Sequence, residues 1–129
     1  MILRATFFGF VLWLIVTGAL RFFGQEFFHP GETGIYILLI ASPIVMGILT
    51  VIALRLLGEA GIDRAEAAVA LALPGMALDI YALNAFPEVF PNLDASLDGA
   101  FGAIKLIGYT AMLLVGLITT RLAPSDERL

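Results

Sequence analysis

The sequence predicts an all-α integral membrane protein, an up-down bundle of four transmembrane helices with both termini in the cytoplasm. Three observations support this prediction: the composition, the apolar segments and the positions of the basic residues. The chain has 129 residues, of which 60% are hydrophobic and 14% are charged. An ordinary soluble domain is about 45–50% apolar and about 25% charged. Because so small a core cannot bury this excess, we expect residues 1–129 to form a single domain whose main partner is the lipid bilayer.

Four apolar segments each have the roughly 20 residues that a helix needs to cross the hydrocarbon core of a bilayer. We expect these spans at residues 5–23, 34–54, 65–85 and 99–120. All four are expected to be helices, because backbone exposed to lipid must satisfy its own hydrogen bonds. Pro43 and Pro74 fall inside spans, and each is expected to kink its helix.

Residues between the spans indicate where the helices begin and end. Gly58 is expected to stop the second helix, because glycine readily adopts the backbone conformation found just past helix C-termini. Asp63 and Glu66 have the D-x-x-E spacing of a capping box for the third helix. Asp94 or Ser96 is expected to cap the fourth helix.

The distribution of basic residues predicts the orientation of the spans. With four crossings, one side receives Arg4, Arg55, Arg64, Arg121 and Arg128. The other side receives only Arg21, and its aromatic residues, Phe22, Phe23, Phe86 and Phe90 among them, are suited to the membrane interface. Because basic residues are enriched on the cytoplasmic side, both termini are predicted to be cytoplasmic, in a multi-pass protein of the inner (plasma) membrane.

The first apolar segment has an alternative interpretation as a secretory signal peptide. Arg4 would supply the basic region, and Thr17-Gly18-Ala19 has the small-residue pattern of a cleavage site. Apolar residues continue past Ala19, which favours a membrane span over a cleaved peptide.

Two charged residues lie well inside the predicted spans, Asp79 in the third and Lys105 in the fourth. Asp79 lies six residues before the end of its span, and Lys105 lies six residues after the start of the next. At ~1.5 Å per residue, both are about 9 Å below the same membrane boundary. Because helices joined by a short connection usually pack side by side, we predict an ion pair between Asp79 and Lys105.

Small residues accompany both charges at helical spacing. The stripe on the third helix contains Ala68, Ala72, Gly75, Asp79 and Ala82, and that on the fourth contains Lys105, Gly108, Met112 and Gly116. Small residues let membrane helices approach closely. We therefore expect the ion pair to lie within a close interface between these two helices.

The predicted ion pair has two functional interpretations. It is either a brace that fixes the register of the helices or a proton or cation site, since ionisable groups inside membranes are often functional. The matched opposite charge favours the brace. In the second interpretation, a polar funnel from the outer face would be lined by Asp79, Tyr81, Asn84, Lys105 and Tyr109.

The segment EFFHPGE holds the only histidine, His29, between Glu26 and Glu32. Glu-x-x-His on a helix can place two metal ligands on one face. Here Pro30 breaks the helix directly after His29, and the chain has no cysteine or second histidine to complete a metal site. We favour a polar turn at the outer face in which Arg21 pairs weakly with Glu26.

Other function classes lack a signal in the sequence. With no cysteine there is no thiolate or disulfide chemistry. With a net charge of -4 and no basic patch, a nucleic-acid partner is not expected. No nucleotide-binding loop, nucleophile elbow or metalloprotease motif is present, so we expect neither an enzyme nor a cofactor.

The sequence resembles a family of small bacterial four-helix membrane proteins catalogued as a domain of unknown function. The resemblance rests on Pro74-Gly75-Met76-x-Leu78-Asp79, on Phe90-Pro91-Asn92 followed by Phe101-Gly102, and on RFFGQEFF at residues 21–28. It extends over nearly the whole chain. It implies an inner-membrane location and four helices, and it carries no functional residue.

Two functions are therefore expected. The first is a non-enzymatic structural or accessory role in the membrane, with a second copy of the chain or another membrane protein as the partner. The second is a small cation- or proton-coupled transporter or channel subunit that uses Asp79 as an oligomer. Exposure of Asp79 to a polar cavity would favour the second, and enclosure of Asp79 against Lys105 would favour the first.

Overall fold

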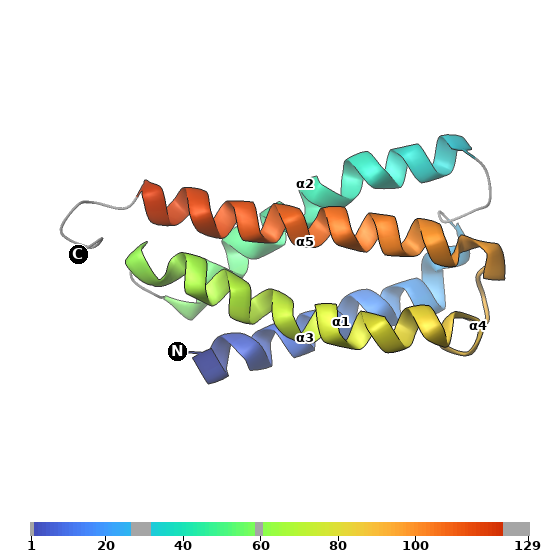
Figure 1. Cartoon of the computed structure of the whole chain (residues 1–129), viewed down its shortest axis with the longest axis horizontal. Helices are drawn as coiled ribbons and strands as arrows, with labels where there is room; N and C mark the ends of the chain where they lie inside the picture. The colour runs from blue at the N-terminus through green and yellow to red at the C-terminus, as the bar shows by residue number, and fades with distance from the viewer. Residues whose placement is uncertain (1, 27–31, 59–60, 123–129) are drawn as a thin grey trace.

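The computed structural model describes residues 2–26, 32–58 and 61–122, which are mostly helical (Figure 1). The helices are α1 (Ile2–Phe23), α2 (Glu32–Leu57), α3 (Arg64–Asn84), the short α4 (Phe86–Val89) and α5 (Asp98–Arg121). Single turns of 3-10 helix adjoin them at Gly24–Glu26, Gly61–Asp63 and Ala95–Leu97. Within the described residues, four helices are long and apolar enough to cross a membrane, which confirms the predicted number of spans.

The long helices alternate in direction, so α1 begins and α5 ends at the same end of the bundle (Figure 1). We call this the termini end, and the opposite end, which carries α4, the α4 end. The alternation confirms the predicted all-α, up-down arrangement. The predicted bounds differ from the observed helices by at most three residues, as at the start of α1, predicted at residue 5 and found at Ile2. α2 and α3 continue through Pro43 and Pro74.

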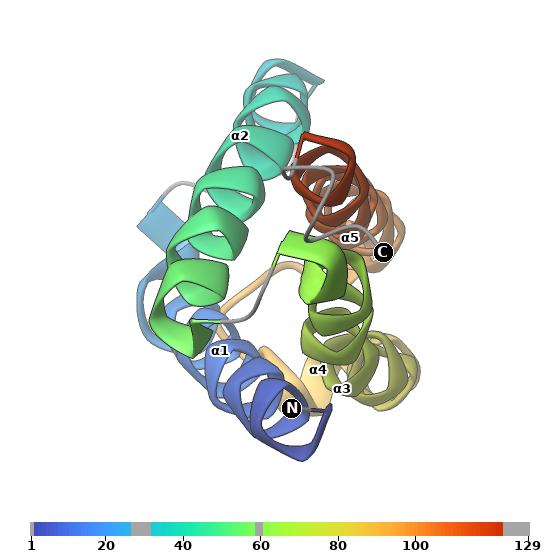
Figure 2. The ribbon, with the colours of Figure 1, turned by 90° about the vertical axis from the view of Figure 1, so that its left-hand side faces the viewer.

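The helices pack in an order that differs from their order in the chain. α1 packs on α3, α3 packs on α5, and α5 packs on α2, as the end view shows (Figure 2). α1 and α2, although consecutive, contact each other at few points. The seam between α1 and α2 is therefore the weakest contact between neighbours in the ring.

One of the predicted helix ends is confirmed and two are corrected. Gly58 follows α2 with a φ of 68°, and its N–H donates to carbonyls of the last turn. The carboxylate of Asp94 accepts hydrogen bonds from the N–H and the hydroxyl of Ser96, so it caps the 3-10 turn Ala95–Leu97. The predicted cap of the last helix is therefore wrong, because α5 begins after Leu97 without a side-chain cap. The predicted capping box at Asp63 is wrong, because its side chain makes no capping hydrogen bond. Instead the hydroxyl of Thr120 accepts from the Ala65 N–H, at 2.8 Å.

The buried side chains form two clusters, one toward each end of the bundle. The cluster at the termini end contains Ala5, Leu54, Leu57, Ala67, Leu71 and Met112 among others. At the α4 end, the rings of Phe86, Phe90 and Phe101 pack together with centroids 5.2, 5.5 and 5.1 Å apart. Phe86 and Phe90 are fully buried, so their rings do not face the membrane, contrary to the expectation for interfacial aromatic residues. The short helix α4 folds them inward over the bundle, whereas Phe22 and Phe23 are exposed as expected.

Glycines mark the places where the helices approach most closely. A side chain at Gly9 of α1 would collide with the backbone of Leu71 in α3, and one at Gly116 of α5 would collide with Ala68. Gly108 had been expected to face α3, but it faces α2, where a Cβ would lie 2.9 Å from the hydroxyl of Ser42. α5 therefore uses different glycines against its two neighbours.

Candidate functional site

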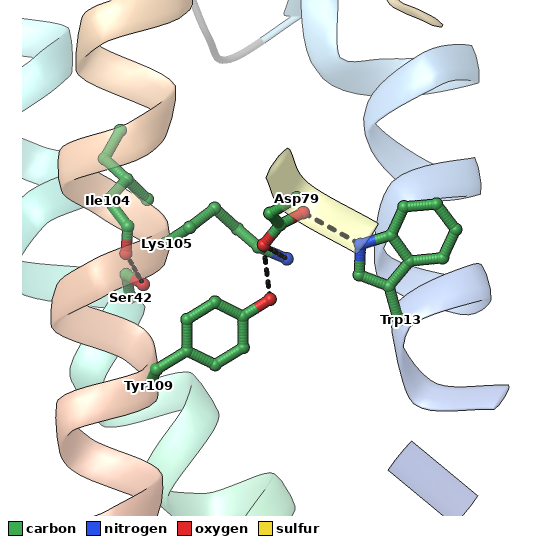
Figure 3. A network of polar contacts seen from close by, with 6 residues as sticks. All are labelled: Trp13, Ser42, Asp79, Ile104, Lys105 and Tyr109. Atoms are coloured by element: carbon green, nitrogen blue, oxygen red, sulfur yellow. Dashed lines mark hydrogen bonds and ion pairs between the residues drawn. The ribbon is translucent and has the colours of Figure 1, made fainter. Parts of the chain in front are cut away.

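The buried carboxylate of Asp79 is the centre of the candidate site (Figure 3). Its residue is 5% exposed, and three side chains from two other helices point at it. The indole Nε1 of Trp13 donates to Oδ1 at 2.8 Å. The hydroxyl of Tyr109 donates to Oδ2, and the ammonium of Lys105 lies 3.5 Å from the same oxygen. The predicted ion pair is therefore present, and it is part of a larger network.

The site joins three helices at one level of the bundle. Trp13 comes from α1, Asp79 from α3, and Lys105 and Tyr109 from α5, one helical turn apart. Gly75 lies one turn before Asp79, and a Cβ at this position would collide with the hydroxyl end of Tyr109. Gly75 therefore leaves the space through which Tyr109 reaches the carboxylate.

The charge of Lys105 is enclosed by the network and by aromatic rings. Its side chain is 12% exposed, and its Nζ lies 5.3 Å from the ring centroid of Tyr109 and 5.9 Å from that of Phe101. A cation over the face of an aromatic ring is attracted by the negative charge density of that face. The opposite charge and the two rings together compensate for the loss of water around the ammonium.

Trp13 is a member of the site that the sequence reasoning missed. A signal was available, because tryptophans of membrane proteins are enriched at the two interfaces. Trp13 is instead near the middle of α1. A buried indole N–H usually finds a hydrogen-bond partner, so a mid-span tryptophan points to a nearby acceptor.

The predicted polar funnel is not formed by the residues named for it. Tyr81 is 63% exposed and Asn84 is exposed, so both lie on the outer surface of α3. The amide of Asn84 donates to the carbonyl of Ile80 in its own helix. The reason is helical geometry, because a residue two positions from Asp79 points to nearly the opposite side. The structure brings together Asp79, Lys105 and Tyr109.

Two hollows adjoin the network without exposing Asp79. A central hollow of about 10 Å³ is lined by Trp13, Gly75, Lys105 and Tyr109 among others. That volume is about the space of one water molecule. A second hollow, of about 290 Å³, lies between α1, α2 and α5, and its mainly apolar wall includes Lys105 and Tyr109. Asp79 lines neither hollow.

A hydrogen bond beside the network ties α2 to α5. The hydroxyl of Ser42 donates to the backbone carbonyl of Ile104 at 2.8 Å (Figure 3). Ile104 directly precedes Lys105, so this contact holds α2 against the segment that carries the ammonium. All four long helices are thereby connected at this level by polar side chains.

The outer-face residues are placed differently from the expectation. The guanidinium of Arg21 donates to the carbonyls of Val89 at 3.0 Å and Glu88 at 3.5 Å, so its expected pairing with Glu26 is wrong. The last carbonyls of α4 lack partners within that short helix, which makes them good acceptors. His29 and the side chain of Glu32 lie outside the described residues. Within the described residues, no three potential metal ligands are grouped.

The fold and this site define a multi-pass membrane protein with a charged network enclosed between its helices. A family model described as a family of unknown function (DUF5367) matches residues 27–123. The chain belongs to this family, which confirms the resemblance to a domain of unknown function. The matched segment includes Asp79, Lys105 and Tyr109, whereas Trp13 precedes it. No curated protein and no solved structure matches the chain.

Proposed function

We propose that the protein has a non-enzymatic, structural or accessory role in the inner membrane, with the Asp79 network as its intramembrane brace. One observation carries the proposal: a single buried carboxylate accepts from donors on two other helices. Such a contact requires α1, α3 and α5 to keep one register. Polar contacts of this kind specify how apolar helices align, which nonpolar packing alone does less strictly.

The geometry supports a brace over a proton site because the carboxylate is already occupied. Oδ1 accepts from Trp13, and Oδ2 accepts from Tyr109 beside the Lys105 ammonium. A group that exchanges protons or cations needs a polar path, and the adjoining central hollow has the volume of about one water. Since the network is enclosed, it would act by fixing the positions of the helices. The outer surfaces of these helices would then make the functional contacts, with lipid or with another membrane protein.

A double-mutant cycle tests the brace. Asp79→Asn and Lys105→Met each leave one buried charge without its partner, so each is expected to destabilise the bundle by about 3 kcal/mol. The double variant removes both charges and is expected to be clearly more stable than the sum of the single effects predicts. The measurement is thermal or chemical unfolding of the purified chain in detergent micelles.

A charge swap would be a weaker test. The donors Trp13 and Tyr109 hydrogen-bond to a carboxylate at position 79, but an ammonium there could not accept their hydrogen bonds.

Tyr81→Phe is the matched control for the double-mutant cycle, because Tyr81 lies on the same helix as Asp79 and is 63% exposed. Strictly additive effects of Asp79→Asn and Lys105→Met would contradict a brace built on this pair.

A second candidate function, a small cation- or proton-coupled transporter or channel subunit, is favoured by one observation. The hollow of about 290 Å³ between α1, α2 and α5 has Lys105 and Tyr109 in its wall. In proteoliposomes, this function requires a cation or proton flux that Asp79→Asn abolishes while the fold is retained. The proposed structural role predicts the same slow flux for the wild type, for Asp79→Asn and for empty liposomes.

A further inference from the structure

A basic hollow lies at the termini end of the bundle, away from the Asp79 network. It is formed between α2, α3 and α5 and has a volume of about 460 Å³. Its wall consists of Val51, Leu54, Arg55, Gly58, Arg64 and Thr119. This volume is within the roughly 300–1,000 Å³ of typical small-molecule sites.

The two arginines of this hollow lack an anionic partner in the part of the chain that the structure describes. Neither Arg55 nor Arg64 has a carboxylate within 4.0 Å or a side-chain hydrogen bond there. Arg4, at the same end, is different, because its guanidinium donates to the carbonyl of Leu57. Two guanidinium groups that have no anionic partner among the described residues create a positive field beside one cavity. This field suits an anion, and the planar forks of the guanidinium groups match phosphate oxygens.

An apolar groove continues from the basic hollow along α2 and α5 toward the α4 end. Its volume is about 400 Å³, and its wall consists of Pro43, Ile44, Gly47, Ile48, Val51, Ile52 and Val115. Val51 belongs to both hollows, and Val115 lies one turn before Thr119 on α5. Gly47 keeps the groove open, since a Cβ there would meet only Val115, at 3.7 Å.

We propose that this continuous surface binds an anionic phospholipid. Its phosphate lies between Arg55 and Arg64 at the membrane boundary, and one acyl chain lies along Gly47 and Val115. The order of the two parts along the bundle matches such a ligand. A basic hollow at the end of a membrane helix, followed by an apolar groove toward the bilayer centre, repeats the polarity of a lipid molecule.

The chemistry also separates a lipid from a free phosphate ion. A free ion would use the arginines and gain nothing from the groove, whereas a lipid gains from both. Basic pockets between membrane helices recognise anionic headgroups, and each arginine near a charged leaflet adds to the attraction. This site shares no residue with the Asp79 network, so the proposal is independent of the proposed function.

The test measures lipid binding to the full-length chain in detergent, by native mass spectrometry and by the rise in melting temperature. The probes are phosphatidylglycerol, phosphatidylcholine and inorganic phosphate. We expect the wild type to prefer phosphatidylglycerol. Arg55→Gln with Arg64→Gln should weaken its binding about tenfold or more, because charge-assisted hydrogen bonds are lost, and should leave phosphatidylcholine binding unchanged.

The groove has its own variant with a matched control. Gly47→Leu should weaken phosphatidylglycerol binding, because leucine fills the depression. Gly18→Leu should not, since a Cβ at Gly18 also meets open space but this residue lies on α1, away from the groove. The double variant Arg55→Lys with Arg64→Lys keeps both charges and should bind phosphatidylglycerol with intermediate affinity. It replaces the glutamine double variant in the comparison if that variant does not fold.

Three results would overturn the proposal. The first is equal binding of phosphatidylglycerol by the wild type and by the glutamine double variant. The second is the same loss of binding for Gly47→Leu and Gly18→Leu. The third is stabilisation by inorganic phosphate that matches phosphatidylglycerol, which would assign the arginines to a free ion.

Discussion

Trp13 makes the network visible to spectroscopy, because it is the single tryptophan of the chain and donates to Asp79. The excited indole is stabilised by polar groups beside it. Asp79→Ala should therefore move the intrinsic fluorescence emission to shorter wavelength, whereas Tyr81→Phe on the outer surface of the same helix should leave it unchanged. Identical spectra for the wild type and Asp79→Ala would mean that the indole is not bonded to this carboxylate.

The carboxylate of Asp94 is expected to make the stability of the fold depend on pH. The hydroxyl and the N–H of Ser96 donate to its carboxylate and hold its pKa below the ordinary value of 3.8. A lowered folded-state pKa stabilises the fold at pH values above 3.8, and this contribution is lost as the pH falls through the lowered value.

The variant Asp94→Ala should accordingly melt at a lower temperature than the wild type at about pH 7. At about pH 3 and below, the difference should shrink as the wild-type carboxylate becomes protonated. Thermal unfolding at the two pH values measures this. A difference that stays constant on acidification would contradict the role of the ionised carboxylate.

At the level of single residues, the sequence predicts the Asp79–Lys105 pair, because the two residues lie at the same depth in neighbouring spans. Counting along two helices was enough to pair Asp79 with Lys105. Tyr81 and Asn84 are close to Asp79 along α3, but closeness along a helix does not determine which side of it a residue faces, and both lie on the exposed surface. Trp13 was missed because it comes from α1, and nothing in the local pattern shows that α1 is the second neighbour of α3.

At the level of helices, the contact between α1 and α3 depends on Gly9. A methyl group at this position would collide with the backbone of Leu71, which cannot move aside as a side chain can. Gly9→Ala should therefore destabilise the bundle by about 1–3 kcal/mol. Gly18→Ala on the same helix meets open space and should change the stability by no more than about 0.5 kcal/mol.

Unfolding of the two variants in detergent measures this difference. Equal stability of Gly9→Ala and Gly18→Ala would show that α1 does not approach α3 closely at Leu71.

The bounds of the helices can be predicted from the sequence here, but the neighbours of each helix cannot. Bounds follow from apolar length and from residues such as Gly58. Neighbours follow from the fit of surfaces, as when Gly108 proves to face α2 instead of α3.

At the level of the whole molecule, the orientation in the membrane stays a prediction. The absence of cysteine makes single-cysteine labelling clean. Leu122→Cys, at the termini end, should be protected from a membrane-impermeant thiol reagent added to intact cells. Glu88→Cys, on the exposed surface of α4, should react. The reverse labelling pattern would place both termini outside the cytoplasm.

The weak seam between α1 and α2 has a consequence for synthesis of the chain. A ribosome releases α1 and α2 first, yet their main partners are α3 and α5, which emerge later. We therefore expect the first two helices not to form a stable hairpin by themselves, and each to gain its main contact only when α3 or α5 is inserted. A nascent chain halted once α2 has entered the bilayer should leave a crosslinker at position 12 free to react with other proteins. One halted once α3 has entered should allow a crosslink from position 12 to position 71, since Leu12 and Leu71 line the same hollow.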